Sequence, residues 1–461
     1  MTSLNRRLFL RSGACGVAGL AALSQLPRVV GQSNGDRPSS ARGDVTVLNP
    51  QGRVPVGLII DDSTCLVNLN RFAMPQFDQA WEHGAAVYHR KWRDWPVEIP
   101  DRFVRKFAEW CSDQGVKGKY SIVPFPACVG RLDRMLPGWT QRELQESLQV
   151  VREWMLPNWD IHPEMVTHTR VIDTKTGHPH TDHSLKFMEN WEWTTGRSVD
   201  EIADYLAYAL RILKNVGLPC EGVTTPGGFG GKALVQLSQA SLQSVRDVYQ
   251  AEVPHYFRHL YSEGKESVAP RVENASGLDG SDPRCVVSIV GCAGDWTGGW
   301  DNTPPGGADK FITADLQSGR MVDIIRRGEP ALMLAHWTGI YWNGEEQGFK
   351  VFQEVVRRLK ARYDHLIWMK LSEISRYWAA KELTQIARTA RDIRFQAPFA
   401  CSQFTVRFLA GANSVPTLGG MPLVEVSGPF KLKPGSWCRD HQSIIVCFAL
   451  PRGSSQIELV G

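Results

Sequence analysis

The chain has 461 residues, 43% of them hydrophobic and 22% charged, which are the proportions of an ordinary globular protein. The formal net charge of +4 is small, and no run of lysine and arginine indicates a nucleic-acid interface. The length exceeds one average domain and favours one large domain with a smaller one appended.

The first residues have the features of an export leader. Asn5–Leu10 reads Asn-Arg-Arg-Leu-Phe-Leu and resembles a twin-arginine signal, and Gly13–Leu23 is apolar but too short to span a bilayer. We therefore predict a Tat signal peptide over residues 1–31 and a polar linker over residues 32–53. The Tat export machinery is then a partner, the protein is periplasmic or extracellular in a bacterium, and no transmembrane anchor is expected.

Ten cysteines, less Cys15 of the predicted leader, leave nine in the mature chain, and none forms a Cys-x-x-Cys pair. An exported protein can form disulfides, but an odd number leaves at least one thiol unpaired. Most of these cysteines are expected in the core.

Beyond residue 54, strand-like and helical patterns alternate about seven times, and this alternation predicts a (β/α) barrel. The barrel is assigned to residues 54–388. The expected strands are Val56–Ile60, Lys119–Pro124, Ile161–His168, Glu221–Thr225, Cys285–Val290, Ala331–Ala335 and Leu366–Leu371, and the expected helices span 101–114, 140–154, 198–216, 312–326 and 346–362.

The last part of the chain has a different pattern. After about residue 390 the helical periodicity stops, and short apolar runs alternate with Gly/Pro turns. Residues 389–461 are predicted to form a small β-sandwich-like domain. Because every candidate site residue precedes it, this domain is expected to be separable from the barrel.

Polar residues stand where the expected strands end. Asp61 and Asp62 follow a short β-branched run typical of a strand buried on both faces, and the carboxyl ends of such strands form the ligand-binding mouth of an α/β fold. Alone, each of these signals has a structural alternative, such as a helix cap at Ser63 or Thr64. The remaining strand-end residues are His168, Pro226 with Gly228, Asp295 with Trp296, and His336.

In order and type these residues resemble the motifs of the polysaccharide deacetylase (NodB-type carbohydrate esterase) family, over about residues 54–385. The resemblance implies a distorted (β/α)7-type barrel of the glycoside hydrolase/deacetylase kind. It implies that Asp61 is the general base and that His336 is the general acid. The remaining roles it implies are metal binding for Asp62 and His168, orientation of the acid for Asp295, and substrate binding for Trp296, Pro226 and Gly228.

Three positions depart from the family's motifs. The second metal-binding histidine, four residues after the first, falls on Ile172, and the arginine that holds the catalytic aspartate falls on Thr224. Ser63 follows the two aspartates where the family has glycine. The chain is therefore expected to be a divergent member, with an altered substrate or a loss of activity as possible consequences.

A third metal ligand has to come from elsewhere, because isoleucine cannot bind a metal. His178, His180 and His183 lie on the loop after the strand, and extended chain spans ~3.3 Å per residue, so each is within reach. We favour His180 because Pro179 restrains the backbone before it, with His183 next. His162 shares a face with His168 but lies ~20 Å back along the strand.

A divalent ion held by a carboxylate and two imidazoles leaves a position for water and lowers the pKa of that water to about 7. We therefore predict a metal-dependent hydrolase that removes acyl groups, N- or O-acetyl above all, from a carbohydrate. Zn²⁺ is favoured, with Co²⁺, Ni²⁺ or Mn²⁺ as alternatives. Two other functions stay open: another carbohydrate-active hydrolase or lyase on the same barrel, and a non-catalytic barrel that uses some of the 16 tryptophans as sugar platforms.

Overall fold

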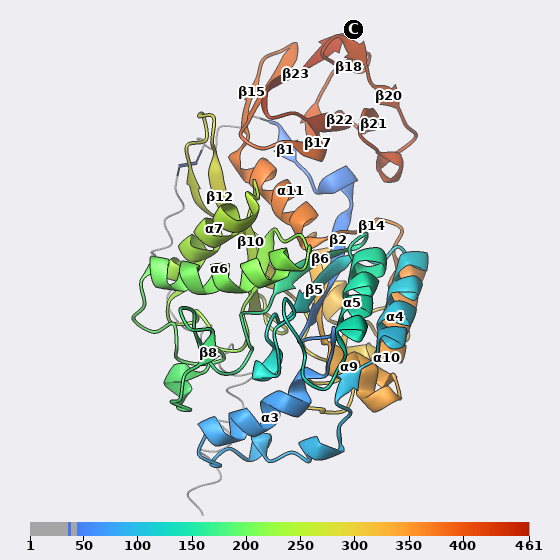
Figure 1. Ribbon diagram of the computed structural model, residues 1–461. Helices are drawn as coiled ribbons and strands as arrows, with labels where there is room; N and C mark the ends of the chain where they lie inside the picture. The colour runs from blue at the N-terminus through green and yellow to red at the C-terminus, as the bar shows by residue number, and fades with distance from the viewer. Residues whose placement is uncertain (1–35, 38–43, 461) are drawn as a thin grey trace, which may run out of the picture.

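The computed structural model describes residues 36–37 and 44–460, so the leader predicted over residues 1–31 lies outside the described residues. The described chain is an α/β domain with a C-terminal all-β part (Figure 1). Within these residues no helix combines the length and the apolar character needed to cross a membrane.

The central strand is β2 (Val54–Asp61), which is buried along its whole length, as its apolar, β-branched sequence predicts. It pairs in parallel with β13 on one side and with β5 on the other, and β5 pairs with β6. A short strand, β14, pairs with the first residues of β2. The other strands of this sheet are β5 (Gly118–Ile122), β6 (Trp159–Pro163), β13 (Ala331–His336) and β14 (Leu366–Trp368).

The next strands along the chain, β9 to β12, form a second sheet. Its parallel strands are β9 (Gly222–Thr224), β10 (His255–Leu260) and β12 (Arg284–Gly291), with β11 (Arg271–Ser276) antiparallel at the edge. Two single contacts join the sheets: a parallel bridge between Glu164 and Thr224, and a 2.8 Å bond from the N–H of Cys292 to the carbonyl of Leu332. The hydrogen-bonded ladders therefore form two sheets rather than one closed barrel.

Helices follow the parallel strands and cover them (Figure 1). Thr140 and Ser198 begin the helices expected near residues 140 and 198, and form capping boxes with Glu143 and Glu201. The helix expected over 312–326 is shorter, because Thr313 and Asp315 bond each other in a turn and only residues from Arg320 are helical. The helices are α3 (Leu69–Ala80), α4 (Asp101–Asp113), α5 (Gln141–Val150), α6 (Val199–Asn215), α7 (Leu234–Tyr249), α8 (Arg320–Arg326), α9 (Trp337–Tyr341), α10 (Gln347–Arg362) and α11 (Leu371–Leu383).

The C-terminal part consists of two five-stranded, mostly antiparallel sheets. One contains β1, which comes from the segment predicted as linker, so residues 46–47 correct that prediction. The other begins with β15, a few residues before the predicted boundary at 389. The strands are, in the first sheet, β1 (Thr46–Val47), β17 (Cys401–Leu409), β20 (Val424–Glu425), β21 (Ser436–Asp440) and β22 (Ser443–Leu450), and in the second β15 (Gln385–Arg388), β16 (Asp392–Ala397), β18 (Val415–Leu418), β19 (Met421–Pro422) and β23 (Gly453–Val460).

The C-terminal sheets share a hydrophobic core with the α/β domain. Buried residues of α11, among them Tyr377 and Trp378, belong to one continuous cluster with Phe395 and Phe404 of the sheets and Leu332 of β13. The hydroxyl of Tyr377 also donates to the carbonyl of Leu48, at 2.7 Å. This shared core argues against the separability expected from the sequence, since the interface is apolar and continuous.

The C-terminal sheets lie at the end of the molecule opposite α3 (Figure 1). Because α3 follows β2, the end of the molecule with α3 holds the carboxyl ends of the parallel strands, where ligands bind in α/β folds. Two short antiparallel pairs lie in the connections: β3 (Leu66–Val67) with β4 (Glu98–Ile99), on either side of α3, and the hairpin of β7 (Ile172–Asp173) with β8 (His178–Pro179).

Candidate active site

The backbone conformation changes at the carboxyl end of β2, between the two adjacent aspartates. Asp61 is the last residue of the strand, whereas Asp62 has a left-handed backbone with φ of 65°. The N–H of Asp62 donates to Oε2 of Glu164 at 2.8 Å, which holds this turn in place. Each carboxylate therefore has its own neighbours, although the residues are consecutive.

Asp62, Glu164 and His168 form a buried group that fits a metal ion. Their ligand atoms all lie within 4.8 Å of one another. Nε2 of His168 lies 3.1 Å from Oδ1 of Asp62 and 3.3 Å from Oε1 of Glu164. Among the described residues Oδ1 of Asp62 faces only this imidazole and Oδ2 has no hydrogen-bond partner, which is costly for a buried charged group.

The charge of this group also favours a cation. Burial opposes protonation of His168, but the facing carboxylates of Asp62 and Glu164 raise its pKa well above the usual value. The group thus carries an excess of negative charge that a divalent ion would neutralise. Two carboxylates and one imidazole are suitable ligands for Zn²⁺, Mn²⁺ or Co²⁺.

The predicted third ligand, His180, lies elsewhere. Its half-buried ring packs against Phe187, with the ring centroids 4.7 Å apart, and it does not belong to the group. Glu164 stands in the place suggested for His180, because the strand ends at Pro163 rather than at His168 and the chain then folds back. The spacing of four residues expected between two histidines is found between Glu164 and His168.

A buried carboxylate holds His168 in this position. Glu189 accepts hydrogen bonds from the backbone N–H groups of Thr167, at 3.1 Å, and His168, at 2.6 Å. His168 has a left-handed φ of 62°, which is uncommon for a non-glycine residue and has to be stabilised locally. Burial raises the pKa of Glu189 to about 7, although the Tyr205 hydroxyl also donates to it.

Asp61 lies beside the metal-fitting group and is paired with a lysine. Lys119 of β5 is fully buried, and its ammonium forms an ion pair with Oδ1 of Asp61 and donates to the Ser121 hydroxyl at 2.6 Å. Lys119 thus supplies the positive charge that the family resemblance assigns to an arginine, whose expected position holds Thr224. Burial and the nearby Glu164 raise the pKa of Asp61, and Lys119 opposes that rise.

His336 lies at the mouth of the neighbouring strand, as predicted. In the parallel pairing of β13 with β2, His336 is in register with Asp61. Its Nδ1 lies 2.8 Å from Oδ2 of Asp295, which also accepts from the backbone N–H of Trp300 at 3.1 Å. Burial opposes protonation, but the carboxylates of Asp295 and Asp62 raise the pKa of His336 to about 10.

The residues predicted to bind substrate have different surroundings. A Cβ at Gly228 would come within 2.8 Å of the carbonyl oxygen of Asn190, and the N–H of Gly228 donates to that oxygen at 2.6 Å. The Asn190 amide lies 3.5 Å from Nδ1 of His168. The Pro226–Gly228 turn is therefore linked to His168 through Asn190. Trp296 is half-buried and packs edge-to-face on Phe311, with centroids 4.9 Å apart.

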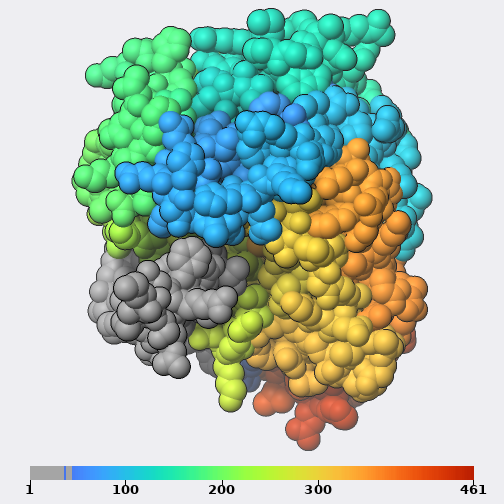
Figure 2. Space-filling view, turned by 90° about the horizontal axis from the view of Figure 1, so that it is seen from below, coloured from blue at the N-terminus to red at the C-terminus, as the bar shows by residue number. Residues whose placement is uncertain are grey.

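Aromatic side chains border the site on the side of α3. We call Phe77, Trp81, Tyr88, Trp191 and Trp300 the aromatic wall; Phe77 lies 5.2 Å from Trp191 and 6.5 Å from the ring of His168, centroid to centroid. Trp81 is 37% exposed. In Figure 2, which looks onto this end of the molecule, the segment around α3 extends across the middle of the face in blue.

Sequence reasoning missed three of these residues as parts of the site. Lys119 reads as an ordinary polar residue at the start of a strand, and Glu189 lies in a loop with no motif. Glu164 lies four residues before His168, and this spacing was a usable signal for a ligand pair.

No protein-family model matches the sequence, and no curated protein matches it significantly. Among solved structures the chain is similar to a protein described as a glycoside hydrolase/deacetylase from Parabacteroides distasonis, with 10% identity over 79% of this chain and 83% of that one, at a TM-score of 0.38. It is also similar to a family 30 subfamily 8 xylanase from Clostridium acetobutylicum, with 10% identity over 90% and 99%, at a TM-score of 0.30. With TM-scores this low, neither fold nor function is inferred from these proteins.

Proposed function

We propose that this protein is a metal-dependent hydrolase that removes acyl groups, N- or O-acetyl above all, from a carbohydrate. The observation that carries the proposal is the pairing of Asp61 with His336 across β2 and β13, directly beside the group formed by Asp62, Glu164 and His168. A carboxylate and a protonated imidazole on adjacent strand ends can act as base and acid on opposite sides of one reacting carbon.

Each residue has one role in this reaction. Bound to Asp62, Glu164 and His168, a divalent ion such as Zn²⁺ would supply Lewis-acid activation of water and of the acyl carbonyl. Asp61 accepts the proton of the attacking water, and Lys119 keeps this carboxylate charged and oriented. His336 donates a proton to the departing amine or alcohol, and Asp295 stabilises the imidazolium before the transfer.

The aromatic wall supports a sugar as the substrate. Trp81, Trp191 and Trp300 are each partly exposed beside the metal-fitting group, and rings with an apolar face and a polar edge are suited to stacking on pyranose rings. On this proposal the two parallel sheets act together as a distorted barrel, with the C-terminal sheets closing the far end. Export through the Tat machinery to the periplasm or beyond is part of the same proposal.

The test is acetate release from a panel of acetylated oligosaccharides, with protein stripped by a chelator and reloaded with Zn²⁺, Co²⁺, Ni²⁺ or Mn²⁺. We expect release that depends on the metal, and a loss of about 10²–10⁴-fold in Asp61→Asn with metal retained. Cleavage of glycosidic bonds without acetate release would instead identify a glycosidase or lyase. Binding without any turnover would identify a carbohydrate-binding protein.

A further inference from the structure

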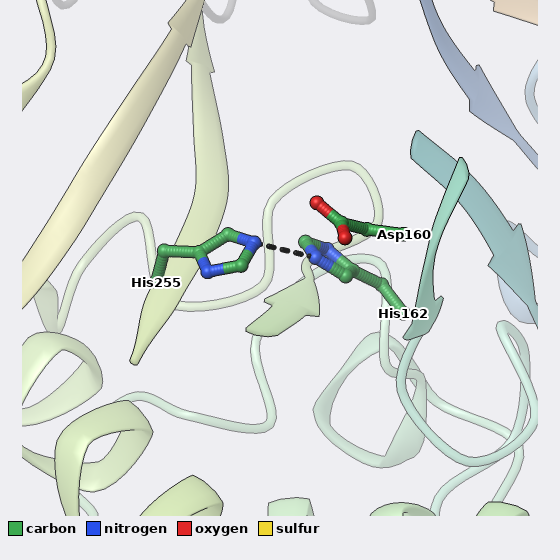
Figure 3. A group of neighbouring side chains, drawn as sticks. All are labelled: Asp160, His162 and His255. Atoms are coloured by element: carbon green, nitrogen blue, oxygen red, sulfur yellow. Dashed lines mark hydrogen bonds between the residues drawn. The ribbon is translucent and has the colours of Figure 1, made fainter. Parts of the chain in front are cut away.

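A second group of metal-ligand residues lies at the other end of the parallel strands. Asp160 and His162 of β6 and His255 of β10 place one ligand atom each within 4.8 Å of the others. Figure 3 shows the three side chains turned toward one another from the two strands. The Nε2 atoms of His162 and His255 are 2.8 Å apart, and both rings are fully buried.

The fold makes room for this approach at one position. Gly222, the first residue of β9, lies between the two histidines in the sheet. A Cβ there would come within 2.6 Å of His162 Nε2 and 2.7 Å of His255 Nε2. Real Cβ atoms are not found at such distances, so the two imidazoles converge because this residue has no side chain.

Two neutral imidazoles that point the same nitrogen at each other share one proton or bind one cation. If they shared a proton, one Nε2–H would donate to the other ring. If they bind a cation, both rings carry their proton on Nδ1, which in His162 lies 3.3 Å from the Thr224 hydroxyl. Burial lowers the pKa of His255 to about 4, so its ring is in the neutral form that binds metals.

The distances need little change to accept an ion. Two nitrogens at about 2.05 Å from a tetrahedral Zn²⁺ lie about 3.3 Å apart, so the rings would separate by about half an ångström. Asp160 is already oriented, because its oxygens accept from the N–H and the hydroxyl of Ser372, at 2.6 and 2.8 Å. Such outer hydrogen bonds are typical of metal-binding carboxylates.

A cavity lies beside Ser372, the hydrogen-bond partner of Asp160. Ser372 lines a cavity of about 160 Å³ between α11 and the C-terminal strand β17, together with Glu221 and Arg376. This cavity lies on the side of the C-terminal sheets, whereas Asp62, Glu164 and His168 lie at the carboxyl ends of the strands. The same face of β6 carries ligands of both groups, since Asp160, His162 and Glu164 alternate along the chain.

We propose that Asp160, His162 and His255 bind a second divalent transition-metal ion, of the Zn²⁺, Co²⁺ or Ni²⁺ class. Two imidazoles and a carboxylate are ligands that these ions prefer over Mg²⁺ or Ca²⁺. The ion links β6 of one sheet to β10 of the other, across the short strand β9. Its role is structural: it joins the two sheets along the edge where a single backbone bridge, between Glu164 and Thr224, connects them.

The test is the metal content of the purified full chain, stripped by a chelator and then loaded with Zn²⁺ or Co²⁺. We expect two ions per chain. His255→Gln keeps most of the side-chain volume and a hydrogen bond to His162, but its amide is a poor ligand, so this variant should bind one ion and unfold at a lower temperature than the wild type in the presence of metal. The matched control is His259→Ala, which removes a histidine of the same strand outside either group and should still bind two ions.

The two metal groups can be tested apart. Asp62→Asn should lose one ion and keep the second, and Asp62→Asn combined with His255→Gln should bind none. The second site would be overturned if His255→Gln bound as many ions as the wild type, whether that number is one or two. A single ion that is lost in His255→Gln but retained in Asp62→Asn would support the second site and overturn the metal assignment of the proposed function.

Discussion

Lys119 and Asp61 form an ion pair in which the lysine side chain is completely buried. The pair lies beside the group formed by Asp62, Glu164 and His168, at the carboxyl end of β2. A buried charge without a partner is strongly destabilising, so each member of the pair depends on the other. This contact joins the stability of the domain to the chemistry proposed for Asp61.

Replacing Lys119 by Met should lower both activity and stability. Asp61 would lose its countercharge and its pKa would rise further, so a larger fraction of the carboxyl would be protonated and unable to accept a proton. We expect the free energy of unfolding to fall by about 3 kcal/mol, measured by urea denaturation, together with a loss of kcat/KM for acetate release. Lys117→Met is the matched control, because Lys117 pairs with Glu373 at the surface and such pairs contribute about 0–1 kcal/mol. Wild-type activity in Lys119→Met would show that Asp61 does not need this lysine.

Glu164→Gln should weaken metal binding, whereas His180→Ala should not. The carboxylate of Glu164 faces His168 Nε2 at 3.3 Å, and its loss should cost at least the roughly 100-fold in affinity that outer-sphere partners cost. The ring of His180 packs on Phe187 and belongs to no metal-fitting group in the described chain. Competition with a chelating dye measures both affinities. The opposite result, in which only His180→Ala loses the metal, would show that His180 is the third ligand, as the sequence predicted.

Asp295→Asn should move the alkaline limit of activity to lower pH. The carboxylate of Asp295 is the largest influence that raises the pKa of His336, which reaches about 10 against the burial that opposes it. Without that negative charge the imidazolium loses its proton at lower pH, and a general acid has to be protonated to work. The profile of kcat/KM against pH measures the shift. Asp301→Asn, in the same loop but paired with Arg90, should leave the profile unchanged; an unshifted profile in Asp295→Asn would exclude Asp295 as the partner of the acid.

Deleting residues 389–461 should destabilise the α/β domain. The deletion exposes Tyr377, Trp378 and Leu383 of α11, which are buried against the C-terminal sheets. Each aromatic ring buries about 150–250 Å², which corresponds to several kcal/mol at ~25 cal/mol per Å². We expect poor solubility or a lower melting temperature by calorimetry. A soluble truncated chain that unfolds cooperatively at the wild-type temperature would instead support a separable domain.

Much of the local structure is determined by the sequence alone. The apolar β-branched run of β2, the capping boxes at Thr140 and Ser198, and the stop at Gly217 depend on residues near each other in the chain, so their patterns identify the elements directly. The strand β10 was not anticipated, because its short run contains two histidines and an arginine. The helix α7 was also not anticipated, although its buried residues recur at helical spacing. The change to an all-β segment near residue 390 was also visible in the sequence.

The site depends on contacts that no local pattern encodes. Asp61, Asp62, His168, Asp295 and His336 could be proposed because each one ends a strand or follows it, and parallel strands bring their carboxyl ends to the same edge. Which side chain completes each group is decided in three dimensions. Lys119 meets Asp61 because β5 pairs with β2, Glu164 rather than His180 lies beside Asp62 and His168, and His162 meets His255 across the short strand β9.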